Sequence, residues 1–126
     1  MPIISIKTLP LDEYEVRTPD ILKKLCTAVA RELNYQTTHV WATWEYIAPH
    51  LYTVGNYSVP YQAQSSHAPL VRVVAFEGKS KKEIEALFLV IARVLSRELD
   101  IDQSNIFIEY CEAKAGRVFD GGQVVG

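Results

Sequence analysis

A proline directly behind the first methionine is the feature of this sequence with the clearest chemical potential. The chain opens MPIISIKTL, and removal of Met1 would give Pro2 a free secondary amine. An apolar pocket or neighbouring cations lower the pKa of such an amine, and a base poised near neutral pH moves protons alpha to a carbonyl. The structural alternative is that Pro2 only begins a strand, a position that proline tolerates because it has no N–H to donate.

The cysteines and histidines do not form a second chemical motif. Cys26 and Cys111 lie within periodic apolar segments, which favours small apolar side chains in a reducing compartment over a disulfide framework. His39, His50 and His67 are scattered without the spacing of a metal site. We therefore expect no metal site.

The elements that position Pro2 come from an internal repeat. RELNYQTTHVW begins at Arg31 and RELDIDQSNIF begins at Arg97, and the two segments align without gaps. Each ends a helix with Arg-Glu-Leu, continues through a polar turn and enters a strand. Pro2 falls near Pro69, which opens the strand-like PLVRVVAF. Two copies of one β-α-β unit therefore account for the whole chain.

Each repeat carries one helix with its own start signal. Thr18-Pro19-Asp20 predicts an N-cap at Thr18, with proline at the first helical position. Ser80 and Glu83 frame a capping box for the second helix. Apolar residues then recur at helical spacing in both segments: Ile21, Leu22, Leu25, Cys26, Val29, Ala30 and Leu33 in the first, and Ile84, Leu87, Phe88, Ile91, Val94 and Leu95 in the second.

These patterns predict an α+β fold with two layers. Two β-α-β crossovers give a four-stranded mixed sheet with both helices on one face. We expect a single domain over residues 1–126, with repeat one at about 2–55, a connection at 56–68 and repeat two at about 69–122. The uncovered face of the sheet carries aromatic and acidic side chains, so the layer rule predicts that an oligomer covers it.

Composition excludes several classes of protein. The chain has 126 residues, of which 48% are apolar and 22% charged, which is typical of one globular domain. The net charge is −2 with interleaved basic and acidic residues, so we expect no nucleic-acid partner. No apolar run reaches the roughly 18 residues of a membrane span, and no signal-peptide pattern opens the chain. We expect a cytoplasmic protein without a membrane partner.

Several short motifs in order resemble the tautomerase superfamily, which includes 4-oxalocrotonate tautomerase and macrophage migration inhibitory factor. They are Pro2 at the head of a β-α-β repeat, FEGKS before the second helix, and IFIEY followed by GRVFDGG. The resemblance covers nearly the full chain and implies a homotrimer whose sheets enclose a central barrel. It also implies that Met1 is removed, that the Pro2 nitrogen is the catalytic base or acid, and that no cofactor is required.

The resemblance further implies which residues bind a small carboxylate substrate. The arginine of the family's EGR turn corresponds to Lys79 in repeat two, where the residue differs, and to Arg17 in repeat one. Phe107 and Glu109 stand where inhibitory-factor-like members turn a tyrosine and an asparagine toward a neighbour's proline, and Tyr52 stands near an apolar-wall position. The alternatives are solvated helix-start charges for Lys79 and Arg17, an interface ion pair for Glu109, and packing for Tyr52.

Three functions remain open at this point. The first is a tautomerase or isomerase in which Pro2 transfers a proton in a keto-enol or allylic rearrangement of a small 2-oxo acid. The second is a dehalogenase- or decarboxylase-type lyase, in which protonated Pro2 is the acid and a carboxylate activates water; the missing arginine cluster argues against it. The third is a non-catalytic trimeric binding protein of the same fold.

Overall fold

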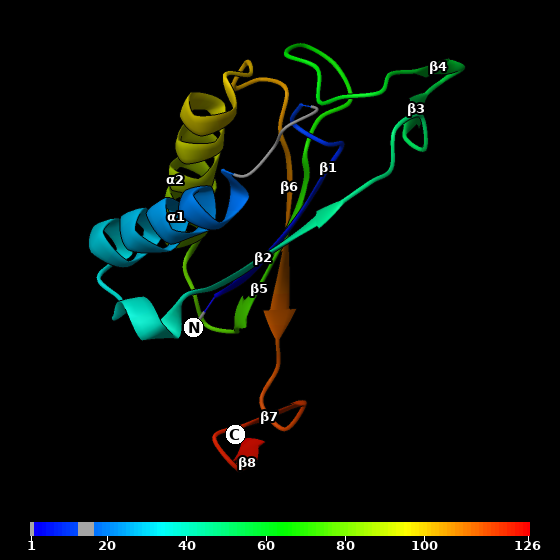
Figure 1. Ribbon diagram of the computed structural model, residues 1–126. Helices are drawn as coiled ribbons and strands as arrows, with labels where there is room; N and C mark the ends of the chain where they lie inside the picture. The colour runs from blue at the N-terminus through cyan, green and yellow to red at the C-terminus, as the bar shows by residue number, and fades with distance from the viewer. Residues whose placement is uncertain (1, 13–16) are drawn as a thin grey trace.

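The computed structural model describes residues 2–12 and 17–126 as two layers, with the helices stacked on one side of a sheet (Figure 1). The elements in chain order are β1 (Ile3–Thr8), α1 (Thr18–Leu33), the 3-10 turn η1 (Thr37–His39), β2 (Trp41–Tyr46), β3 (Thr53–Val54), β4 (Tyr57–Ser58), β5 (Leu70–Phe76), α2 (Lys81–Leu99), β6 (Phe107–Ala113), β7 (Val118–Asp120) and β8 (Gln123–Val125).

The main sheet has the order β2-β1-β5-β6. β1 is parallel to β2, and β5 is parallel to β6, as the crossovers require. β1 and β5 are antiparallel, and their pairing joins the two repeats. The predicted fold class, a four-stranded mixed sheet with two helices on one face, is confirmed. Because β1 and β5 run in opposite directions, their first residues lie at opposite ends of the sheet.

The two helices end in the same way, as the repeat predicts. Asn34 follows α1 with φ 60°, and Asp100 follows α2 with φ 53°. Asn and Asp adopt this left-handed conformation more readily than most residues because their short polar side chains bond locally. α1 has 16 residues and α2 has 19, so the second helix is longer.

The helix starts differ from each other, and one prediction was wrong. The capping box of α2 is present: Ser80 Oγ accepts from the Glu83 N–H at 3.2 Å, and the Ser80 N–H donates to Glu83 Oε1 at 3.1 Å. In α1 the cap residue is Arg17, without a side-chain cap bond, and Thr18 is already helical. The Thr18 hydroxyl instead forms a hydrogen bond with the Tyr46 hydroxyl.

The core lies between the sheet and the helices. Ile4 and Ile6 of β1 and Val71 and Val73 of β5 point to the helices and are buried. The helices meet them with the apolar stripes that periodicity predicts; their most deeply buried residues are Leu25, Val29, Leu87, Ile91, Val94 and Leu95. No helix among the described residues is long and apolar enough to cross a membrane.

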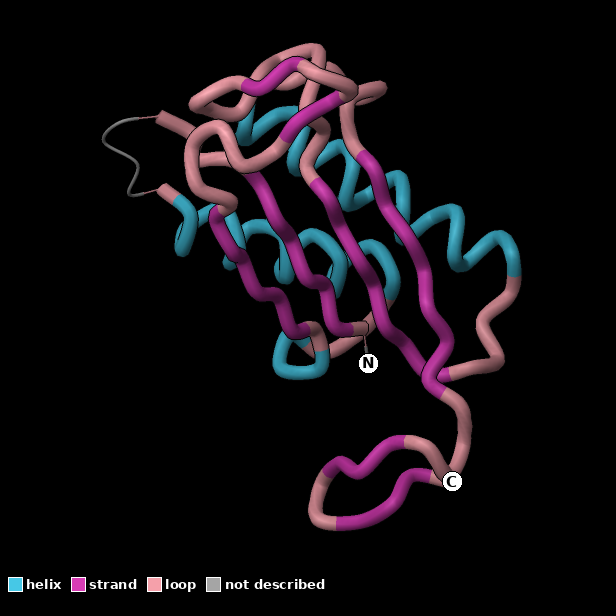
Figure 2. The backbone as a smooth tube through the Cα atoms, turned by 90° about the vertical axis from the view of Figure 1, so that its right-hand side faces the viewer, coloured by secondary structure: helices cyan, strands magenta, loops and turns pink. Residues whose placement is uncertain are grey.

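The other face of the sheet has no covering layer within one chain, and Figure 2 shows its strands in front of the helices. A shallow hollow of about 430 Å³ lies on this open face, lined by Ser5, Lys7, Glu45, Leu70, Val71, Arg72, Phe107 and Glu109. Trp41 and Phe107 remain 45% and 56% exposed here. Large exposed aromatic side chains on a sheet face are typical of an interface.

The connection between the repeats is ordered by side chains that bind its backbone. Asn105 Nδ2 donates to the carbonyls of Ala63, Gln64 and Ser66 at 3.3, 3.2 and 2.9 Å. The buried His67 ring lies between the Ser66 hydroxyl and the Tyr57 carbonyl, at 2.9 Å from each. These bonds fix the segment that delivers Pro69 to the start of β5.

Candidate active site

Pro2 is buried at the start of a central strand. Its carbonyl accepts from the Trp41 N–H at 3.1 Å, and the next residue, Ile3, pairs with Trp41 on β2 and Val74 on β5. The strand-starting role predicted for Pro2 is therefore confirmed. The predicted loss of Met1 concerns a residue outside the described ranges.

Pro69 is the structural counterpart of Pro2 in the second repeat. It is buried at the start of β5, and its carbonyl accepts from the Phe107 N–H at 3.1 Å, the same bond in the equivalent place. The Pro69 nitrogen is part of an internal peptide bond and has no proton to exchange. Only the Pro2 end of the sheet can therefore offer a secondary amine.

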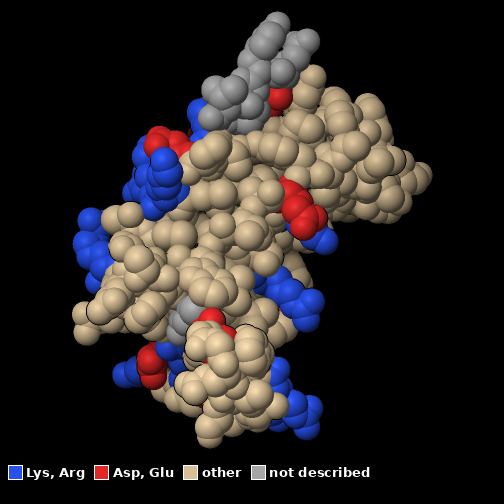
Figure 3. All heavy atoms as spheres, turned by 60° about the horizontal axis from the view of Figure 1, so that its bottom comes forward, with Lys and Arg blue, Asp and Glu red and all other residues tan. Residues whose placement is uncertain are grey.

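An apolar hollow of about 130 Å³ lies beside Pro2, where the sheet meets the C-terminal hairpin. It is lined by Ile3, Val74, Ala75, Phe76, Ala113 and Val118. Apolar walls of this kind disfavour a charged ammonium and so lower the pKa of an amine that lies against them. Figure 3 views the molecule from this end and shows much uncharged surface, with basic groups mostly toward its margin and a few acidic groups between them.

The two residues that follow Pro2 face opposite sides of the sheet. Ile3 lines the hollow, whereas Ile4 points the other way into the helix-covered core. The walls contributed by Val74, Phe76, Ala113 and Val118 were not predicted. The antiparallel register of β1 with β5 brings Val74 next to Ile3. A prediction of how the two repeats pair would have been needed to identify Val74 as a wall of this hollow.

Lys79 lies at the same end of the sheet as Pro2, in the turn between β5 and α2. Its Nζ sits 4.8 Å from the centroid of the Tyr35 ring, a distance at which a cation is attracted to an aromatic face. Tyr35 was not among the predicted site residues. Both residues line a hollow of about 240 Å³ between the end of α1 and the start of α2.

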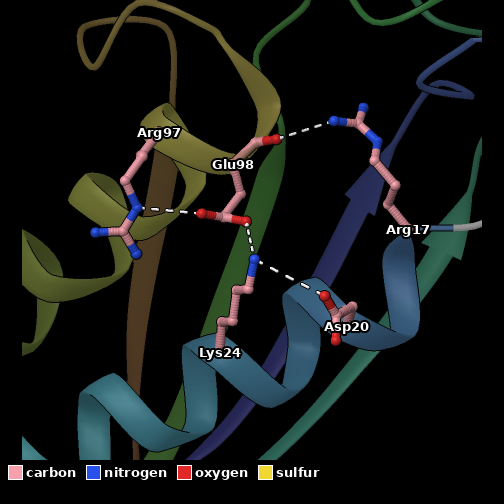
Figure 4. A network of polar contacts seen from close by, with 5 residues as sticks. All are labelled: Arg17, Asp20, Lys24, Arg97 and Glu98. Carbon is pink, nitrogen blue, oxygen red and sulfur yellow. Dashed lines mark hydrogen bonds and ion pairs between the residues drawn. The ribbon is translucent and has the colours of Figure 1, made fainter.

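Arg17 lies at the opposite end. It donates from Nη1 to the carbonyl of Glu98, in the last turn of α2, at 3.4 Å (Figure 4). Lys79 immediately precedes the first turn of the same helix, so the two cations are separated by roughly 28 Å of helix. One chain therefore does not bring Arg17 and Pro2 together.

Phe107 and Glu109 lie on the open face, displaced toward the Pro69 end. Phe107 pairs with Leu70, and Glu109 pairs with Arg72. Glu109 is two strands across and three residues along from Pro2, a separation on the order of 10–15 Å. Its carboxylate lies 3.3 Å from Arg72 Nε of the same chain, so Glu109 forms an ion pair within the chain, and the interface ion pair stays a prediction.

Tyr52 lies at the Pro69 end and is used for packing. Its hydroxyl donates to the Ala68 carbonyl at 2.8 Å, and its ring meets the His67 ring edge-on with centroids 5.2 Å apart. Burial raises the pKa of this hydroxyl, which keeps it a hydrogen-bond donor. Tyr52 thus supports the residue before Pro69 in its own chain.

The structure divides the six predicted residues between the ends of the sheet. Pro2 and Lys79 share one end, Arg17, Tyr52 and Phe107 lie toward the other, and Glu109 lies between them on the open face. Among the described residues, no cluster of three or more His, Cys, Asp or Glu side chains is arranged to hold a metal ion.

The site is thus that of a tandem β-α-β protein with a proline at the head of its first strand. No family model matches the chain, and no curated protein matches it in sequence. Solved structures do match over nearly its whole length. A wild-type fused 4-OT asymmetric trimer is 14% identical, with a TM-score of 0.82 over 97% of this chain and 94% of that chain.

Two further structures extend the likeness. Pt0534 inactivated by 2-oxo-3-pentynoate is 11% identical, with a TM-score of 0.83 over 98% of this chain and 94% of that chain. A macrophage migration inhibitory factor-like protein from Entamoeba histolytica is 13% identical, with a TM-score of 0.73 over 98% and 97%. At these identities the matches establish the fold. The chain has the fold of the tautomerase superfamily, as the resemblance implies.

Proposed function

We propose that this protein is a cofactor-independent tautomerase in which Pro2, exposed as a secondary amine after removal of Met1, transfers a proton in a small 2-oxo acid. The observation that carries the proposal is the placement of Pro2, buried at the head of a central strand beside an apolar hollow. Among the described residues, Pro69 also stands at the start of a strand, but its nitrogen lies in an internal peptide bond.

The proposed reaction needs only one group that alternates between base and acid. In the ketonisation of an enol, the neutral Pro2 amine takes the hydroxyl proton as the carbonyl forms. The resulting ammonium then donates a proton to the neighbouring carbon, which returns the amine to its neutral form. A base with a pKa near the working pH does both steps efficiently, and the apolar walls around Ile3 favour the neutral form.

The substrate class follows from charge and from the fold neighbours. Lys79, at the Pro2 end, offers a positive charge to a carboxylate, although without the two-pronged geometry of arginine. Pt0534, which shares the fold, is inactivated by a 2-oxo acid, 2-oxo-3-pentynoate. Lys79 at the Pro2 end and this neighbour favour a small 2-oxo carboxylate over a neutral substrate.

We further propose that the active assembly is a homotrimer. The fused 4-OT neighbour is a trimer, and the open sheet face of this chain carries exposed aromatic side chains that need a cover. Pro2 lies at one end of the sheet, and Arg17, Tyr52 and Phe107 lie toward the other. A head-to-tail ring of subunits would therefore place these three residues and Glu109 of one subunit against the Pro2 of its neighbour.

The proposal is tested by the rate at which the protein ketonises the enol of phenylpyruvate or 2-hydroxymuconate, followed by ultraviolet absorbance. The protein that begins at Pro2 is expected to accelerate the reaction, and Pro2→Ala is expected to reduce kcat/KM because it replaces the secondary amine by a primary one. Pro69→Ala is the matched control, since it changes the equivalent strand start and is expected to keep the activity. Equal rates for wild type and Pro2→Ala would contradict the proposed base.

A further inference from the structure

A groove runs between the two helices on the side of the helix layer that faces away from the sheet. Its volume is about 260 Å³. Ala28 is buried at its floor, and this small side chain leaves room between α1 and α2 that a larger residue would fill. The lining residues are Lys23, Lys24, Thr27, Ala28 and Arg31 of α1 and Arg97 of α2.

The acidic groups beside this groove are already engaged with cations. Glu98 receives Lys24 Nζ at 3.0 Å on Oε1 and Arg97 Nε at 3.1 Å on Oε2 (Figure 4). These two bonds, that of Lys24 foremost, lower the pKa of the Glu98 carboxyl, and Glu98 in turn raises the pKa of Lys24. Asp20 lies 3.8 Å from Lys24. One turn further along, Glu32 forms an ion pair with Arg93.

The groove therefore holds more positive charge than its own carboxylates balance. Within residues 2–12 and 17–126, neither Lys23 nor Arg31 has an acidic partner. Figure 4 shows the terminal nitrogens of Arg97 directed away from Glu98. The four lining cations exceed Glu98 and Asp20 by two charges, in a protein whose net charge is −2.

The unbalanced groups form one line along α1. Lys23, Thr27 and Arg31 are spaced by four residues, which places them on the same face of the helix over roughly 12 Å. The Thr27 hydroxyl adds a neutral donor between the two cations. Several donors spread along an open cationic groove suit an anion with many acceptor oxygens. A single carboxylate has only two oxygens, and the Glu98 carboxylate already pairs with Lys24 and Arg97.

We infer that this groove binds a soluble phosphate-bearing ligand, with Lys23, Arg31 and the free face of Arg97 as its partners. A phosphate group carries −1.5 to −2 charges at neutral pH and three strong acceptor oxygens, which matches the excess of two charges. Arginine pairs with phosphate through two parallel N–H donors. The groove faces away from the open sheet face, so an assembly formed through that face leaves it accessible, and the inference does not depend on the proposed reaction.

Titration with inorganic pyrophosphate at low ionic strength, followed by the backbone NMR signals of 15N-labelled protein, tests this inference. Shifts are expected at residues 23–31 and around Arg97, and they are expected to saturate. Lys23→Gln/Arg31→Gln is expected to weaken the affinity at least tenfold. Lys81→Gln/Lys82→Gln removes the same charge from the start of α2, outside the groove, and is expected to bind like wild type.

Three results would overturn the inference. The first is that sodium chloride at matched ionic strength produces the same shifts, which would make the groove an ordinary screened surface. The second is equal affinity of the wild type and the Lys23→Gln/Arg31→Gln variant. The third is binding to vesicles that contain phosphatidic acid without binding to pyrophosphate, which would assign the cations to a lipid surface. None of these results bears on the activity assay of Pro2.

Discussion

A chain that carries one extra residue in front of Pro2 is expected to lose the proposed tautomerase activity by a factor of about 10² to 10⁴, the usual contribution of a positioned general base. Insertion of leucine between Met1 and Pro2 converts the proline nitrogen into an amide, which has no basic lone pair. The strand start is kept, because the Pro2 carbonyl still accepts from the Trp41 N–H. The initial rate of enol ketonisation, with intact mass to define the N-terminus, measures the effect.

The control for this variant is the same leucine added after Gly126. It changes the length of the chain equally and leaves the Pro2 nitrogen untouched, so full activity is expected. Circular dichroism of both variants checks that the fold is kept. If the chain extended before Pro2 were as active as the one extended after Gly126, the proton would be carried by another group and the account of Pro2 would fail.

Leu95→Ala is expected to lower the free energy of unfolding by about 2–5 kcal/mol, the range for a fully buried leucine replaced by alanine. Leu95 lies on the apolar stripe of α2 and has no exposed surface. The neighbouring core residues come from both helices and from the central strands, and such a packed site closes only partly around a lost side chain. Denaturant unfolding at one fixed protein concentration measures the change.

Leu89→Ala is the matched control in the same helix. Leu89 is 61% exposed, and alanine is at least as good a helix former as leucine, so a change below about 0.5 kcal/mol is expected. Two variants with similar losses would contradict the assignment of the core face of α2. The comparison separates burial from helix propensity, because both substitutions are chemically identical.

Much of the fold follows from local patterns that the chain repeats. The segments beginning at Arg31 and Arg97 predict two equivalent helix ends, and Asn34 and Asp100 adopt the same left-handed cap. The Ser80 capping box was predicted from spacing alone. The cap predicted at Thr18 was wrong, because Thr18 is already the first helical residue, and its hydroxyl meets the Tyr46 hydroxyl of a distant strand.

The candidate site could be predicted only in part. Pro2 stands out in the sequence because its position behind Met1 is itself the chemical signal. The distribution of Lys79 and Arg17 over opposite ends follows from the antiparallel pairing of β1 with β5, which no single β-α-β motif contains. The ion pair of Arg72 with Glu109 likewise depends on the register of β5 with β6. It could not be predicted from the local sequence around either residue.

Covalent labelling by 2-oxo-3-pentynoate tests the central claim most directly, because it requires both a free amine at Pro2 and a site that accepts a 2-oxo acid. The amine nitrogen adds to the alkyne carbon farther from the oxo group, one π bond of the alkyne opens, and the proton lost from the nitrogen is taken up by the carbon next to the oxo group. Mass spectrometry of the digested protein is predicted to find one adduct per chain on the peptide that begins with Pro2, with parallel loss of activity. An unlabelled Pro2 peptide, with any adduct confined to Cys26 or Cys111, would contradict the account.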